Sequence, residues 1–339
     1  MRSIHLAWLA AVLAAAACSD RAPVAYGNAN AVIVIAMDSV WETVGDRFHA
    51  ALEPRIFAVR DERTFDVTHV SPAEPEWRTL RQWKQVIVIG KADDAWVSPA
   101  LDRDALPNGT APALAEKGDI WARGQLVTAV VLPPDAGPEA VIDVIPELHR
   151  RLDSRFRQYT LERMFASGPN TALRDSLRAR AGFGLLVPQV YDVTWGERAI
   201  RFLNDQAVSP QIIRSIVVTW RPGADSSLDA EKLFAWRDSV VAEHYTEPQV
   251  TNRDRIESRT LDAYPAGSFE VVGIWSSPPG QFPAAGPFIG RVIVCPEQDR
   301  TYFIDAWLYA PAKGKYEYML QFETILDTFE CAGSPASAE

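Results

Sequence analysis

The first chemically informative residue is Cys18, which follows a short apolar segment at the N-terminus. Arg2 supplies one positive charge, an apolar stretch runs from Ile4 to Ala17, and its last three residues are alanines. A positive start, an apolar core and small residues before a cleavage point are the pattern of a secretory signal peptide. Cleavage after residue 17 would leave Cys18 as a lipid-modified N-terminus.

This segment predicts where the protein works. It is shorter than the roughly 20 apolar residues that a membrane span needs. Acyl chains such as palmitate on Cys18 would hold the protein on a membrane, because each buried methylene contributes about 0.8 kcal/mol. We therefore expect a lipoprotein of the cell envelope that faces the periplasm, with membrane lipid as one partner. Ser19, in place of Asp, favours the outer membrane, whereas Ala15 stands where a lipoprotein signal usually has Leu. An ordinary signal peptide with an incidental cysteine is the alternative.

Two further cysteines, Cys295 and Cys331, form a candidate disulfide. An isolated pair in an oxidising compartment is the usual material for such a bond. Cys295 ends an apolar run typical of a strand, and Cys331 follows the last expected helix, so the bond would fasten the C-terminus to the sheet. Two buried thiols are the alternative.

A Gly/Pro-rich stretch at 275–288 is the candidate ligand surface. We read it as a long loop, and loops held by a rigid sheet often carry binding residues. Its candidate residues are Trp275, Phe282, Gly286, Pro287 and Phe288. A well-packed irregular crossing without a ligand is the alternative.

Catalytic and cofactor motifs are not found in the sequence. It has no GxSxG, HExxH, GxxxxGK[ST] or GxGxxG pattern, and its histidines are scattered without i,i+3 or i,i+4 pairing. We therefore expect no cofactor and no metal site. Acids and serines far apart in the chain could still meet in a cleft, so an enzyme is left open.

The charge and the tryptophans limit the binding partners. A formal net charge of −10 argues against nucleic acid as a partner. Eleven tryptophans could build a platform for stacking sugars, although most fall on apolar faces of expected elements and favour core packing.

A run rich in arginine lies between residues 149 and 180. It could meet lipid headgroups or an acidic partner. A connecting helix whose arginines pair with acids on either half of the chain is the favoured interpretation.

Apolar periodicity predicts the elements of the first half. Residues 31–37 form a continuous apolar run, typical of a strand covered on both faces. A helix with Trp41, Val44, Phe48 and Leu52 on one face should follow. Further elements are a short helix around 77–83, strands at 64–70, 85–90 and 125–133, and helices at 139–165 and 171–181.

The second half has the pattern of an antiparallel sheet with helices packed on it. Helices are expected near 228–244 and 314–329, and strands at 190–203, 212–220, 269–275, 291–295 and 301–309.

The expected fold class is α+β or α/β, with two sheet-and-helix lobes after a cleaved lipoprotein signal. A duplicated unit is an open alternative. The predicted boundaries are a signal peptide at 1–17, a flexible tether at 18–30, an N-terminal α/β lobe at 31–135, connecting helices at 136–183, a C-terminal antiparallel lobe at 184–331 and a disordered tail at 332–339.

The C-terminal half resembles a family of envelope lipoproteins known as domain of unknown function 4837. The residues that carry the resemblance are Arg237-Asp238-Ser239-Val240, Gly273-Ile274-Trp275, Gly286-Pro287-Phe288, Tyr309-Ala310-Pro311 and a closing run from Lys315 to Thr328. The N-terminal pattern also fits, so the resemblance covers most of the chain. It implies a fold and an envelope location, and it implies no activity, catalytic residue or cofactor.

Together these features predict a non-enzymatic envelope protein that binds a ligand or an unknown envelope partner. An envelope hydrolase with a carboxylate or serine site, and a carbohydrate-binding protein, are the alternatives.

Overall fold

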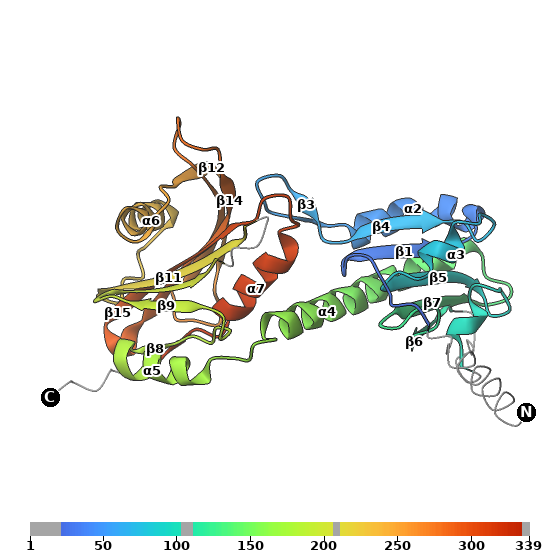
Figure 1. Cartoon of the computed structure of the whole chain (residues 1–339), viewed down its shortest axis with the longest axis horizontal. Coiled ribbons are helices and arrows are strands. Elements are labelled where there is room, and N and C mark those ends of the chain that lie inside the picture. Colours follow the sequence, from blue (N-terminus) through green and yellow to red (C-terminus); the bar gives the residue numbers. More distant parts are fainter. Residues whose placement is uncertain (1–21, 103–110, 206–210, 334–339) are drawn as a thin grey trace, which may run out of the picture. The chain divides into compact units, whose positions relative to one another are not determined.

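The computed structural model describes residues 22–102, 111–205 and 211–333, and it divides into two compact units (Figure 1). The N-terminal unit comprises the described residues up to Pro54 together with Phe65–Leu152. The C-terminal unit comprises Arg55–Thr64 and the described residues from Asp153 onward. The predicted signal peptide, Cys18 and positions 334–339 of the predicted tail lie outside the described residues.

The N-terminal unit is built on a five-stranded sheet in the order β4-β1-β5-β7-β6. Its first four strands are parallel to their neighbours, and β6 is antiparallel to β7. The predicted strand at 31–37 is β1, all five of whose residues are buried, as its continuous apolar run indicates. The strands are β1 (Ala31–Ile35), β4 (Asp66–Val70), β5 (Gln85–Lys91), β6 (Ala113–Gly118) and β7 (Leu126–Leu132).

Helices accompany this sheet where the apolar period changes to 3.6 residues. In α2 (Asp38–Leu52), Val44, Phe48 and Leu52 are buried as predicted, while Trp41 stacks on the His69 ring at 4.7 Å. The remaining helical segments are α3 (Trp77–Leu80), η1 (Ser98–Ala100), η2 (Pro138–Val144) and α4 (Ile145–Met164). Helix α4 contributes its residues up to Leu152 to this unit and the rest to the C-terminal unit.

The predicted tether at 18–30 is wrong for the part that the structure describes. The backbone N–H of Arg123 donates to the Pro23 carbonyl at 2.8 Å, and that of Ala25 donates to the Arg123 carbonyl at 2.9 Å. The Tyr26 hydroxyl donates to the Thr79 carbonyl at 2.9 Å. Small and polar residues look flexible in sequence, but here their backbone groups are satisfied by the folded unit, so the segment is docked.

The C-terminal unit is built on a seven-stranded antiparallel sheet in the order β12-β13-β14-β15-β11-β10-β9. The predicted strand at 190–203 is two strands joined by a tight turn, in which the Gly196 N–H donates to the Ala199 carbonyl at 2.8 Å. The strands are β9 (Asp192–Trp195), β10 (Ala199–Asn204), β11 (Ile213–Pro222), β12 (Val250–Thr260), β13 (Phe269–Ser276), β14 (Ala285–Cys295) and β15 (Arg300–Tyr309).

Helices cover both faces of this sheet (Figure 1). Helix α6 (Ala230–His244) packs Leu233, Phe234 and Trp236 on one face, against a core that includes Phe303 and Trp307. We call this the α6 face. Helices α5 (Thr171–Ala181) and α7 (Tyr316–Leu326) pack against the opposite face, which carries Tyr302, Ile304 and Leu308. Successive side chains of β15 thus point alternately into the two hydrophobic cores on opposite faces of the sheet.

Small strand pairs complete the C-terminal unit. Strand β2 (Arg55–Ile56) pairs with β3 (Glu62–Arg63), and Lys315 holds this hairpin through a 3.1 Å ion pair with Glu62. Strand β16 (Glu330–Cys331) pairs with β8 (Phe183–Gly184), and η3 (Pro296–Gln298) links β14 to β15.

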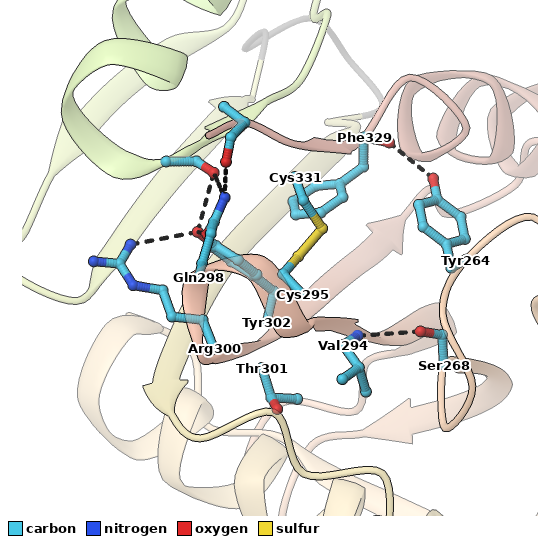
Figure 2. The surroundings of a disulfide bond; sticks show 12 residues. Tyr264, Ser268, Val294, Cys295, Gln298, Arg300, Thr301, Tyr302, Phe329 and Cys331 are labelled. Atoms are coloured by element: carbon cyan, nitrogen blue, oxygen red, sulfur yellow. Dashed lines mark hydrogen bonds between the residues drawn. A yellow bond between two sulfur atoms is a disulfide. The ribbon is translucent and has the colours of Figure 1, made fainter. Parts of the chain in front are cut away.

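The predicted disulfide between Cys295 and Cys331 is confirmed (Figure 2). It joins the last residue of β14 to β16 across a Cα–Cα distance of 6.0 Å, within the usual range for such a bond. Around it, the Tyr302 hydroxyl donates to the Gln298 side-chain oxygen at 2.6 Å, and the Tyr264 hydroxyl donates to the Phe329 carbonyl at 2.9 Å. The bond therefore fastens the final strand to the sheet, as the sequence predicts.

The arginine-rich helices pair their charges locally. Arg151 binds Glu147 at 2.6 Å, Arg157 binds Asp153 at 2.8 Å, and Arg163 binds Glu317 at 3.2 Å. Neighbouring acids engage these guanidinium groups, which agrees with the favoured interpretation of a connecting helix.

The two units are not copies of one another. One has a mainly parallel sheet and the other a fully antiparallel one, and the strand orders differ. The alternative of a duplicated unit is therefore wrong. Both halves alternate apolar strands with helices, and that coarse pattern does not encode strand direction.

None of the helices in the described ranges combines the length and the apolar composition that crossing a bilayer requires.

Candidate ligand-binding site

A pocket of about 420 Å³ opens on the α6 face of the C-terminal sheet, beyond the end of helix α6. Its floor is made of Trp275 on β13 and of Trp307 and Tyr309 on β15. Its wall is the loop 277–284, which supplies Ser277, Gln281, Phe282 and Ala284. The rest of the lining comes from Gln211, Ile213, Glu247 and Pro248. We call this site the aromatic pocket.

The floor follows from strand alternation. Asp305, Trp307 and Tyr309 are two residues apart along β15, so their side chains share one face. The Trp275 and Trp307 rings lie 5.3 Å apart between centroids with an interplanar angle of 77°. The Trp275 indole N–H donates to the Leu308 carbonyl at 3.2 Å, which fixes the orientation of this ring.

The loop that forms the wall is closed by its own ends. The Ser277 N–H donates to the Ala284 carbonyl at 2.8 Å, and the Ala284 N–H donates to the Ser277 hydroxyl oxygen at 3.2 Å. Gly280 turns the chain with a φ of +85°, a conformation that glycine adopts readily. The Phe282 side chain at the rim is 78% exposed. A closed loop thus presents an aromatic ring beside the floor.

A fully buried polar network lies on the same face, next to the floor. Arg237 on α6 and Asp305 on β15 are both 0% exposed, and Nε of Arg237 lies 3.1 Å from Oδ1 of Asp305. The Arg237 guanidinium also donates to the Thr251 hydroxyl at 2.8 Å and to the Gln249 side-chain oxygen at 2.6 Å. Buried charges are tolerated only when they are paired and hydrogen-bonded in this way. The network therefore anchors α6 and β12 to the centre of the sheet.

Tyr245 connects this network to the floor. Its hydroxyl donates to Oδ2 of Asp305 at 2.5 Å, and its ring lies 5.5 Å from that of Trp307. Burial, and then the negative charge of Asp305, raise the pKa of the Tyr245 hydroxyl well above its ordinary value. Tyr245 therefore remains a proton donor to Asp305 and takes no part in acid–base chemistry near neutral pH.

The sequence-predicted ligand surface is only partly brought together. Trp275 lines the floor and Phe282 the rim. Gly286, Pro287 and Phe288 are buried in β14 and do not line the pocket. Phe288 packs in the core beneath the Arg237 guanidinium, 4.1 Å from ring centroid to Cζ.

The predicted loop at 275–288 is thus shorter in the structure, where only 277–284 is irregular. Glycine and proline indicate loops in sequence, but each has a place in this strand. A Cβ at Gly286 would overlap the Leu308 carbonyl oxygen, so the close approach of two strands requires glycine. The β14–β15 pairing begins with Phe288 and Trp307, so Pro287 lies just outside it. Proline has no backbone N–H, and at this position β15 does not require one as a hydrogen-bond donor.

Sequence reasoning missed Glu247, Trp307, Tyr309 and the buried Arg237–Asp305 pair. A signal was present in 301–309, where Asp305, Trp307 and Tyr309 alternate with apolar residues. That period places an acid and two aromatic residues on one face of a single strand. Glu247 had no comparable signal, because it lies in an irregular segment after α6.

A second pocket of about 400 Å³ lies near the other end of this face and bears on the hydrolase alternative. Glu197, Ser239, Glu243 and His244 line it. The Ser239 hydroxyl donates to the Ala235 carbonyl at 3.1 Å, and no hydrogen bond joins it to His244 within the described ranges. Nor do the residues that the structure describes contain a cluster of His, Cys, Asp and Glu able to hold a metal ion.

The sugar-platform alternative requires coplanar exposed tryptophans. Trp275 and Trp307 are each 3% exposed and nearly perpendicular. Every tryptophan among the described residues is buried or partly buried. The structure therefore lacks such a platform in its described part, and core packing of these rings is the outcome.

Comparison with known families divides the chain between residues 167 and 170, whereas its compact units divide between Leu152 and Asp153. Residues 170–328 match the family described as Domain of unknown function (DUF4837), and residues 25–167 match the family described as Domain of unknown function (DUF8532). The chain is thus similar to two families of unknown function in succession, and the C-terminal match is to the family that its motifs resemble. That resemblance was expected to extend over most of the chain, but the N-terminal domain has a family model of its own. No curated protein matches the chain.

Solved structures give weak likenesses. The Saccharomyces cerevisiae Ran-binding protein Mog1p is 11% identical, with 45% of this chain and 91% of that one covered and a TM-score of 0.31. LpqN, involved in cell envelope biogenesis of Mycobacterium tuberculosis, is 13% identical, with 43% and 81% covered and a TM-score of 0.27. Human STARD10 is 5% identical, with 46% and 72% covered and a TM-score of 0.22. Likenesses at these scores carry no argument about the function of this chain.

Proposed function

We propose that this protein is a non-enzymatic, lipid-anchored protein of the cell envelope that binds a small molecule in the aromatic pocket. The observation that carries the binding role is the pocket itself, whose volume of about 420 Å³ lies within the range of about 300–1,000 Å³ typical of small-molecule sites. Three aromatic rings on rigid strands form its floor, and a closed loop forms its wall. Such sites combine an apolar body with a few polar groups that orient the ligand.

The support for the location is the N-terminal sequence. The apolar segment, the three alanines and Cys18 are the pattern of an exported lipoprotein. Acyl chains on Cys18 would anchor the protein in a membrane, with its folded part in the periplasm. Ser19 favours the outer membrane. The membrane lipid is then a partner through the anchor, and the pocket ligand is a separate one.

A non-catalytic role is favoured over hydrolysis by the composition of the pocket. Glu247 is the one acid among the described lining residues, and no histidine accompanies it. Hydrolysis by acid–base catalysis commonly uses a general acid together with a general base, each in a suitable protonation state. The aromatic pocket offers one carboxylate and several rings, a set suited to holding a molecule.

The test compares two full-length variants that each add an indole. Ala284→Trp would fill the pocket, whereas Leu161→Trp adds the same group on the exposed side of α4, where Leu161 is 44% exposed. The proteins are purified from envelopes under non-denaturing conditions, and small molecules that they retain are identified by mass spectrometry. Wild type and Leu161→Trp should retain a molecule that Ala284→Trp loses. Equal retention by all three folded proteins would contradict the proposal.

A further inference from the structure

The aromatic pocket has a charge bias that points to the kind of molecule it accepts. Among its described lining residues, Glu247 is the only charged one. Glu247 is exposed, and the described residues provide no ion-pair partner for its carboxylate. The chain as a whole carries a formal charge of −10. An anionic ligand would be repelled here, and a cation would be attracted.

The rings of the pocket favour a cation for a second reason. Trp275, Phe282, Trp307 and Tyr309 all line it. An aromatic face carries partial negative charge, so it attracts an ammonium group that approaches within about 6 Å of the ring centre. Among these rings, Phe282 is 78% exposed, so its face is open to a ligand at the rim of the pocket.

The orientation of the rings favours a rounded group over a flat one. Trp275 is inclined by 77° to Trp307 and by 47° to Tyr309. A flat sugar or nucleobase needs one broad ring face to stack on. Trp275 and Trp307 pack edge to face against each other and offer no such face, whereas the exposed Phe282 and the partly buried Tyr309 can contact a compact cationic head at the rim.

We propose that the aromatic pocket binds an organic cation through an alkylammonium head of the trimethylammonium type, with Glu247 as its counter-ion. This inference rests on the proposed binding function and specifies its ligand class. The volume of about 420 Å³ leaves room for part of the molecule to which the head is attached. Gln211 and Gln281 offer amide groups to hydroxyl or ester oxygens on that part.

The probe is choline, and its control is 3,3-dimethyl-1-butanol, which has the same shape without the charge. Binding to the full-length protein is measured by calorimetry. Choline should bind at least about tenfold more tightly than the neutral alcohol, because only choline gains from the rings and from Glu247. Affinity for choline should fall as the salt concentration rises.

The matched variants are Glu247→Gln and Glu243→Gln. Glu243 is an exposed acid that lines the other pocket. Glu247→Gln should weaken choline binding by about tenfold and leave the neutral alcohol unaffected, while Glu243→Gln should change neither. Phe282→Ala, at a side chain that is 78% exposed, should weaken choline binding without affecting the fold. Choline binding that is no tighter than that of the alcohol, or that survives Glu247→Gln, would overturn the inference.

The ammonium group could belong to a free molecule or to a lipid headgroup. Vesicles of phosphatidylcholine, compared with vesicles of phosphatidylglycerol, separate these sources in the presence of free choline as competitor. Choline-sensitive binding to the former assigns a lipid headgroup, and binding of free choline alone assigns a soluble cation. Both results support the inference.

Failure of this inference can be told from failure of the proposed function. If choline does not bind but wild type still retains a molecule that Ala284→Trp loses, the ligand class is wrong and the binding role stands. If no molecule depends on the pocket in either experiment, both are wrong.

Discussion

Arg237 and Asp305 form an ion pair in which neither side chain has exposed surface, with Nε and Oδ1 3.1 Å apart. The pair joins α6 to the central strand β15 and lies in the same layer as the floor of the aromatic pocket. Thr251, Gln249 and Tyr245 satisfy further hydrogen-bonding groups of the two side chains. The residues that carry the family resemblance thus include Arg237, which supports the pocket, and Trp275 and Tyr309, which line it.

Replacing Arg237 with Met should lower the free energy of unfolding by about 3–5 kcal/mol, because Asp305 would then be a buried charge without its partner. The double variant Arg237→Met/Asp305→Leu should recover part of this loss, since no charge is left buried. Arg253→Met is the control, because Arg253 binds Glu231 and Asp238 at the surface and should cost less than about 1 kcal/mol. Urea denaturation followed by fluorescence measures all three. A loss for Arg237→Met no larger than that of the control would contradict the structural role of the pair.

Tyr245→Phe should destabilise the protein by about 1–3 kcal/mol at pH 8, because Asp305 would lose a hydrogen bond. The folded-state pKa of Tyr245 lies well above its ordinary value of 10.0. The stability that this raised pKa provides is fully present below pH 10 and is lost as the unfolded chain ionises above it, at about 1.4 kcal/mol per pH unit. The difference between wild type and Tyr245→Phe should therefore shrink by about 1 kcal/mol between pH 8 and pH 11. Other tyrosines are common to both proteins and cancel. A difference that grows with pH would contradict the raised pKa.

The sequence predicts most elements of this fold because apolar periodicity reports burial directly. The continuous apolar run of β1 and the helical spacing of Val44, Phe48 and Leu52 in α2 both correspond to buried positions. Strand direction is not encoded in such patterns, so the difference between the parallel and antiparallel sheets was not foreseen. Strand β12 was also missed, because most of its residues are exposed and several are charged, as is usual for an edge strand.

The candidate site could be predicted only in part. The 275–288 segment locates the wall of the pocket correctly, because its central residues do form a loop. Trp307, Tyr309 and Glu247 come from distant segments, and only pairing of β13, β14 and β15 brings the two strands of the floor close to the loop. Such a site depends on strand order, and a single sequence does not reveal that order.

Gly286→Ala should destabilise the protein strongly, by about 3 kcal/mol, because the new methyl group would overlap the Leu308 carbonyl in a close-packed sheet. Gly280→Ala is the matched change within the wall loop. Gly280 has open space around it and a φ of +85°, so alanine should cost only the strain of that conformation, about 1 kcal/mol. Thermal unfolding ranks the two variants. A larger loss at Gly280 than at Gly286 would show that the β14–β15 approach is looser than described.

Removing the disulfide with Cys295→Ala/Cys331→Ala should lower the free energy of unfolding by about 3 kcal/mol, because the bond spans 36 residues and restricts the unfolded chain. A reducing agent should destabilise wild type by a similar amount and leave the double variant unchanged. Mass spectrometry of non-reduced peptides should find the two cysteines joined. Alkylation of both thiols in the native protein isolated from the envelope would refute the bond in the cell.

Cys18→Ala should abolish palmitate labelling and release the protein into the soluble periplasmic fraction, because the acyl chains are its expected attachment to the membrane. Pro23 is already held by the Arg123 N–H, so the anchor would keep the N-terminal unit within about 18 Å of the bilayer even with the intervening chain fully extended. Ser19→Ala is the control, which should keep both label and anchor and test only the sorting role of Ser19. Fractionation of envelopes with an antibody against the body of the protein measures each outcome. Membrane retention of Cys18→Ala equal to that of wild type would contradict the lipoprotein prediction. The N-terminal segment that begins with Arg2 would then be an ordinary signal peptide with a different cleavage point.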